Sequence, residues 1–164
     1  MKIRTGLVSN SSSSSFVVIG NKRPKVVLLG KDTLQVPDDL GGTTEFGWEP
    51  EDHKDLGSLI NFAYLQICGK RSQADWKKDK KTNYIADQWL KMLEAILKKN
   101  LGVKKIEWNL TNDYEPLNSS PYGYIDHQSN AEEGQNIKMF DSPEELERFI
   151  FSPDSYIHTD NDNH

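Results

Sequence analysis

The stretch FVVIGNKRPKVVLLG, residues 16–30, decides the fold prediction for this chain. It holds two short apolar runs rich in valine, residues 16–20 and 25–30, and the polar NKRP lies between them. Short valine-rich runs bounded by glycine and turn residues are typical of β-strands. The stretch therefore predicts two neighbouring strands joined by a tight connection, close to the N-terminus.

Helices and further strands are predicted downstream of this stretch. Apolar residues recur with a helical period over residues 52–68 and again over residues 85–101, and a glycine follows each stretch. Ser142, Pro143 and Glu145 occupy the N-cap, N1 and N3 positions of a third, brief helix. Shorter apolar or alternating runs predict strands at 33–37, 43–48, 106–110, 122–128 and 156–159.

This order of elements predicts an α+β fold. We expect a mainly antiparallel sheet, with the two longer helices and the short helix packed on one face. The polar, basic residues 71–83 predict a loop between the longer helices. With 164 residues the chain suits one domain, and we assign residues 1–15 to a basic, serine-rich arm and residues 16–164 to a single α+β domain.

Composition narrows the class of protein. An aromatic share of 10% argues against a disordered chain. No apolar run approaches the roughly 18 residues of a membrane span, and the polar serines after Lys2 and Arg4 do not resemble a signal peptide. The single cysteine, Cys68, cannot form an intramolecular disulfide. These features predict a protein of the reducing cytoplasm.

Charge is distributed unevenly along the chain, although the net charge is only −5. Residues 1–31 carry six basic groups and no acid. Residues 107–164 carry thirteen acids against two basic residues, Lys138 and Arg148. The sequence therefore predicts an electrically two-sided molecule whose field would orient its encounter with a partner.

The serine tract in residues 8–15 is the first candidate site. Consecutive backbone N–H groups and hydroxyls can hold an anion, and basic residues nearby would add charge. The alternative is a flexible leader, since serine is a common linker residue. The candidate anion-binding residues are Lys2, Arg4, Ser9, Asn10, Ser11, Ser12 and Ser13.

The second candidate is a divalent-cation site built from Asp126, His127, Asp160 and Asp162. Carboxylate and imidazole groups suit manganese, magnesium or zinc. The alternative is a strand end with hydrogen-bonded polar residues and a solvated terminus. No other cofactor is predicted.

The opening MKIRTGLVSNSSSSSF, residues 1–16, resembles the start of a group of small, uncharacterised proteins of tailed bacteriophages and some bacteria. Those chains open with a basic residue, Gly-Phe-Val-Ser-Asn, a serine tract and phenylalanine, and here Leu7 stands at the first phenylalanine position. The segments FGWEPE (46–51), YIDHQS (124–129) and SYIHTDNDN (155–163) are similar to the same group. The resemblance implies a phage source and no assigned activity, so it implies no catalytic residues.

These observations predict an accessory protein that binds a host protein or a small anionic ligand in the infected cell. Two alternatives stay open: a metal-dependent hydrolase or nuclease, and a virion-associated structural protein. We expect no membrane partner. Nucleic acid is not expected either, because Asp75 and Asp79 interrupt the basic stretch around Trp76.

Overall fold

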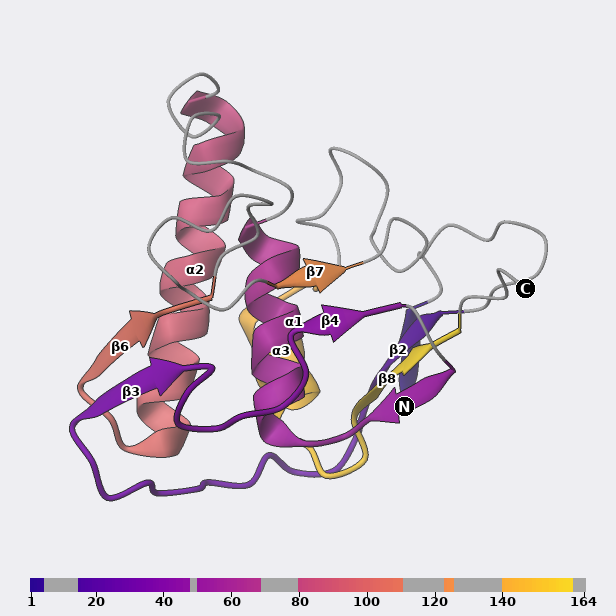
Figure 1. Ribbon diagram of the computed structural model, residues 1–164, viewed down its shortest axis with the longest axis horizontal. Helices are drawn as coiled ribbons and strands as arrows, with labels where there is room; N and C mark the ends of the chain where they lie inside the picture. The colour runs from indigo at the N-terminus through magenta and orange to yellow at the C-terminus, as the bar shows by residue number, and fades with distance from the viewer. Residues whose placement is uncertain (5–14, 48–49, 69–79, 111–122, 126–139, 161–164) are drawn as a thin grey trace.

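The computed structural model describes residues 1–4, 15–47, 50–68, 80–110, 123–125 and 140–160 (Figure 1). The helices of this part of the chain are α1 (Leu56–Cys68), α2 (Lys80–Leu101) and α3 (Pro143–Phe151). Its strands are β1 (Lys2–Arg4), β2 (Phe16–Ile19), β3 (Thr33–Val36), β4 (Glu45–Phe46), β5 (Glu51–His53), β6 (Lys105–Trp108), β7 (Tyr124–Ile125) and β8 (Tyr156–Thr159).

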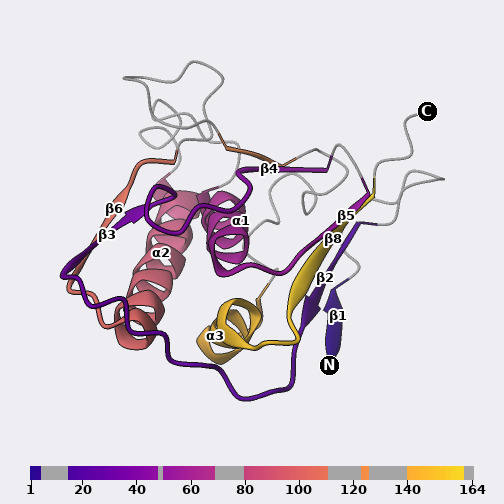
Figure 2. The same ribbon diagram turned by 60° about the horizontal axis from the view of Figure 1, so that its bottom comes forward.

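A four-stranded antiparallel sheet in the order β1-β2-β8-β5 forms one side of the fold. Helices α1 and α3 lie on one face of this sheet, and α2 lies beyond them (Figure 2). Two small parallel pairs, β3 with β6 and β4 with β7, complete the described strands. The predicted α+β class, with its mainly antiparallel sheet, is confirmed.

The core lies between the helices and the four-stranded sheet, which we call the central sheet. Phe62 of α1 packs edge-to-face on Phe46, with 5.1 Å between ring centroids, and approaches Phe149 of α3 at 6.1 Å. All three rings are completely buried. Aromatic rings at such separations contribute both apolar burial and a favourable ring–ring term, so these contacts join β4, α1 and α3 into one core.

The start of α3 follows its sequence signature. The Ser142 hydroxyl accepts a hydrogen bond from the Glu145 backbone N–H at 3.2 Å, and Pro143 occupies the first helical turn. The Glu145 carboxylate in turn accepts the Asp141 backbone N–H at 2.7 Å. The first bond satisfies one of the N–H groups that a helix start otherwise leaves without partners, and the second ties the residue before the cap to the helix.

The strand predicted at residues 25–30 is wrong. The segment has the alternating hydrogen bonds of an extended chain, but its acceptors are the ends of helices: the Val27 and Leu29 N–H groups donate to the Asn100 and Leu101 carbonyls of α2, at 2.9 and 3.1 Å. The Lys25 N–H donates to the Phe151 carbonyl of α3 at 3.0 Å. The last carbonyls of a helix lack partners within the helix, and they bind this segment in place of a neighbouring strand.

Two helix boundaries also differ from the prediction. Residues 51–53 form β5 against β8, and α1 begins only at Leu56, because the Asp55 carboxylate accepts the Ser58 N–H at 2.8 Å and so caps the helix there. The α2 helix begins at Lys80, inside the predicted loop 71–83. Its end at Leu101 agrees with the prediction, since Gly102 adopts a φ of 70° that favours glycine.

The strand predicted at 156–159 is confirmed as β8, with the same bounds. The remaining predicted strands are present but differ in length or pairing, except that most of the strand predicted at 122–128 lies outside the described residues. The strand predicted at 33–37 is β3, which pairs with β6 and not with the central sheet. Strand β1 was not predicted, and it lies within the segment assigned to the N-terminal arm.

Candidate functional site

Lys2, a candidate anion ligand, lies among carboxylates. Its ammonium group contacts Asp141 Oδ2 at 2.6 Å and Glu145 Oε1 at 2.7 Å. Residues 1–31 contain no acid, but the pairing of β1 with β2 brings the start of the chain to the start of α3. The Lys2 charge is therefore partly engaged within the fold.

The C-terminal candidate Asp160 lies beside the end of the serine tract. Its backbone N–H donates to the Ser15 hydroxyl at 3.0 Å, and that hydroxyl lies 3.3 Å from the Asp160 carbonyl oxygen. The antiparallel pairing of β2 with β8 causes this meeting, because the beginning of one strand lies opposite the end of the other. The other candidates lie outside the described residues: Ser9, Asn10, Ser11, Ser12, Ser13, Asp126, His127, Asp162 and the side chain of Arg4.

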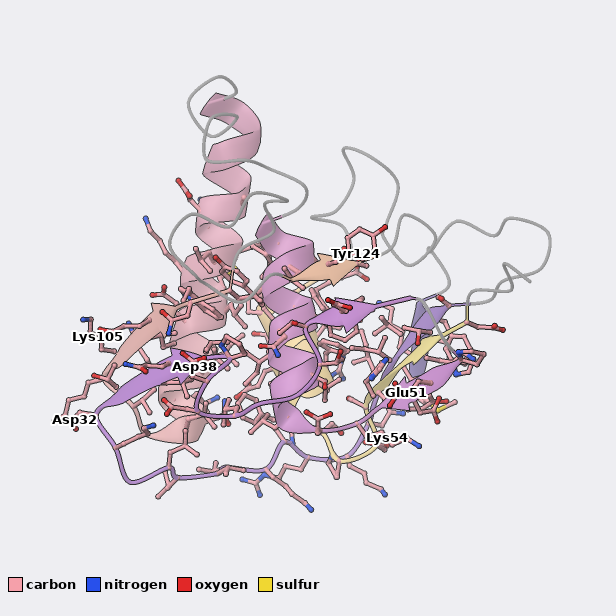
Figure 3. The ribbon with its side chains drawn as sticks, viewed as in Figure 1. Asp32, Asp38, Glu51, Lys54, Lys105 and Tyr124 are labelled. Atoms are coloured by element: carbon pink, nitrogen blue, oxygen red, sulfur yellow. The ribbon has the colours of Figure 1, made fainter. Side chains whose placement is uncertain are left out.

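A histidine–carboxylate pair that the sequence analysis missed lies on the central sheet. His158 Nδ1 and Asp52 Oδ1 are 2.8 Å apart across β8 and β5, and Phe16 of β2 stacks on the imidazole at 4.8 Å between centroids. The hydrogen bond to His158 and a second one to Lys54 hold the pKa of Asp52 below its usual range. In Figure 3, Glu51 and Lys54 mark this side of the molecule, far from Asp32 and Lys105.

A second histidine lies on the opposite face of the same strands. His53 is buried against the Phe46 ring, 5.3 Å away between centroids, and its Nε2 lies 3.4 Å from the Thr159 hydroxyl. Burial lowers the pKa of His53, because desolvation disfavours the imidazolium form. Successive residues of β5 point to opposite faces, so His53 and Asp52 do not share a site.

These groups do not form a recognisable catalytic or metal centre in the described part of the chain. No group of three or more metal-ligating side chains occurs there. Among the same residues, no serine, threonine or cysteine side chain is hydrogen-bonded to His158. A histidine–carboxylate pair needs a nucleophile or a bound substrate within reach to act as a base.

A surface of different character lies at residues 22–31, which we call the edge segment. It runs past the C-terminal ends of α3 and α2 along one margin of the molecule, between β2 and β3 (Figures 1 and 2). Its side chains Val26, Val27 and Leu28 are 64, 40 and 73% exposed. A run of three exposed apolar residues is unusual on a folded domain unless the run has a function.

The edge segment is held firmly at its beginning as well as along its length. The Ser152 hydroxyl donates to the Lys22 carbonyl at 2.8 Å, and the Asp154 carboxylate accepts the N–H groups of Asn21 and Lys22 at 3.3 Å. The Ser152 hydroxyl also contacts Asp154 Oδ1, and this hydrogen bond, followed by those from the Lys22 and Asn21 N–H groups, lowers the pKa of Asp154. The apolar side chains therefore extend from backbone that the fold positions.

Basic residues flank the exposed apolar run. Lys22, Arg23 and Lys25 are exposed and form no ion pair with any residue the structure describes. Lys31, beyond the run, contacts the Asp39 carboxylate. The sequence already contained this signal, because lysine and proline beside an apolar run are typical of an exposed sheet edge.

No family model, curated protein or solved structure matches this chain. Among the described residues, no helix is long and apolar enough to cross a membrane.

Proposed function

We propose that this chain is a small phage-type accessory protein that binds a polypeptide of the infected host cell through its edge segment. The observation that carries the proposal is the exposure of Val26 and Leu28 on backbone held by two helix ends. The N-terminal resemblance supports the phage source and a place in the host cytoplasm.

Preorganised backbone favours binding. A loop that orders itself on binding loses conformational entropy, and that loss weakens the complex. The edge segment is already fixed through Lys25, Val27 and Leu29. Its exposed side chains can therefore bury apolar surface against a partner, at about 25 cal/mol per Å², with little ordering cost.

A polypeptide suits this surface better than a small anion does. At the N-terminal candidate site a small anion would compete with two carboxylates for the Lys2 ammonium. Val26 and Leu28 offer apolar area that only a partner with apolar side chains can cover.

Site-specific photo-crosslinking in a bacterial lysate tests the proposal. A benzophenone amino acid at position 28 should give a discrete adduct with one host protein, and the same group at position 87, an exposed site on α2, should not. The identified protein is then purified and its affinity measured. Val26→Ser with Leu28→Ser should weaken that affinity at least tenfold while leaving the melting temperature unchanged.

Equal crosslinking from positions 28 and 87, or unchanged affinity in the double variant, would refute a role for this surface. Recovery of the chain in purified virions, in place of a host adduct, would favour the structural alternative.

A further inference from the structure

The backbone of the edge segment has two unlike sides. The N–H groups of Lys25, Val27 and Leu29 point toward the helices and donate to their carbonyls. The N–H groups of Val26 and Leu28 donate to no group among the residues the structure describes. In an extended chain successive N–H groups point to opposite sides, so these two face away from the protein.

The outward side therefore has the two components of a strand-addition site. Two N–H donors at alternate positions can pair with the carbonyls of an incoming strand, and main-chain bonds of this kind supply affinity in strand addition. Val26 and Leu28, both more than half exposed, lie on the same face and can contact alternate side chains of that strand.

The local charge selects among possible strands. Lys22, Arg23 and Lys25 form no ion pair within the described residues, and the segment 22–31 holds no acidic residue. An acidic strand would gain from each of these cations, whereas a basic strand would be repelled.

A second copy of this chain is a poor occupant. Antiparallel pairing of two edge segments through Val26 and Leu28 would centre on Val27 and would bring Arg23 of each copy opposite Lys31 of the other. Like charges directly opposite on paired strands are destabilising. Pro24 also removes one outward N–H, which shortens the ladder that two copies could form.

We propose, on the basis of the proposed function, that the partner contributes an extended, acidic stretch of polypeptide. This stretch adds to the outward side of residues 25–29 as a β-strand. Its carbonyls accept the Val26 and Leu28 N–H groups. Its acidic residues lie beside Arg23 and Lys25.

The test uses a synthetic peptide in which valine and threonine alternate between glutamate pairs at both ends, and a matched peptide with lysine in place of glutamate. Each is titrated to millimolar concentration into the ¹⁵N-labelled protein. The acidic peptide should shift the Val26 and Leu28 amide signals and slow their hydrogen exchange, and the lysine peptide should do neither. No perturbation within residues 22–31, or equal effects of the two peptides, would overturn the inference.

Proline variants separate strand addition from side-chain contact. Val26→Pro and Val26→Ala both lose the valine side chain, but only the first loses the outward N–H. Because only the proline variant loses one hydrogen bond to the peptide, Val26→Pro should bind the acidic peptide about three- to tenfold more weakly than Val26→Ala.

Each failure has a different meaning. If the alanine and proline variants bind equally while the serine double variant loses its host partner, the surface binds but not by strand addition. If the serine variant keeps its partner, the proposed function fails. If Val26 and Leu28 become protected at high protein concentration without peptide, the occupant is a second copy and the acidic strand is refuted.

Discussion

Replacing Val27 with proline should destabilise the fold, whereas the same change one residue earlier should not. The Val27 N–H donates to the Asn100 carbonyl at the end of α2, at 2.9 Å. Proline removes that donor and leaves the carbonyl without this partner. Losing one partner of such a bond costs about 1–3 kcal/mol, which corresponds to about 2–4 °C of melting temperature per kcal/mol for a domain of this size.

Alanine variants at the same two positions serve as controls, because they remove the valine side chain and keep the N–H. The stability difference between Val27→Pro and Val27→Ala should be about 1–3 kcal/mol, and that between Val26→Pro and Val26→Ala about 0.5 kcal/mol or less. Urea unfolding followed by tryptophan fluorescence measures both differences. Equal differences at the two positions would refute the arrangement in which only alternate N–H groups bind the helix ends.

Three further predictions concern other contacts within the fold. Glu145→Gln should lower the free energy of unfolding by about 1–3 kcal/mol in urea titrations, since the buried carboxylate loses its charged contact with Lys2; an unchanged midpoint would contradict this. Burial lowers the pKa of His53, so the folded protein binds its proton less readily than the unfolded chain. Stability should therefore fall as the pH drops below the ordinary value of 6.5, and His53→Gln should flatten this dependence in melting curves between pH 8 and about 5. Gly42→Ala should destabilise more than Gly41→Ala, because both residues have positive φ but only at position 42 would a Cβ meet backbone, at 2.3 Å; calorimetry that ranks them in the reverse order would refute the close approach.

Local sequence signals predicted the elements whose stability is largely local. The cap at Ser142, the glycine after Leu101 and the helical periods of α1 and α2 act within a few residues, and each was visible in the sequence. The α+β class followed from their order. The pairing of β3 with β6 could not be predicted in this way, because it depends on where the helices place the chain.

The edge segment shows that a sequence pattern can predict the backbone conformation without predicting the hydrogen-bond partners. An apolar, valine-rich run predicts extended backbone, and residues 25–29 are extended. The pattern does not indicate which acceptors bind the alternate N–H groups. In this fold the acceptors are helix carbonyls. The run therefore lies at the surface with Val26 and Leu28 exposed, where the sequence predicted a strand neighbouring residues 16–20.

The histidine–carboxylate pair was missed for a related reason. Asp52 and His158 are 106 residues apart, and only the pairing of β5 with β8 brings them together. The sequence predicted Asp52 at the start of a helix. That prediction did not indicate any contact between Asp52 and the strand near the other end of the chain.

Amide hydrogen exchange of the unbound protein tests the central claim most directly. The Lys25, Val27 and Leu29 amides should exchange slowly because helix carbonyls hold them, and the Val26 and Leu28 amides should exchange at nearly the rate of an unstructured chain. This alternation would establish a fixed extended segment whose outward N–H groups are available for pairing. Uniform protection across residues 25–29, or uniform rapid exchange, would contradict it.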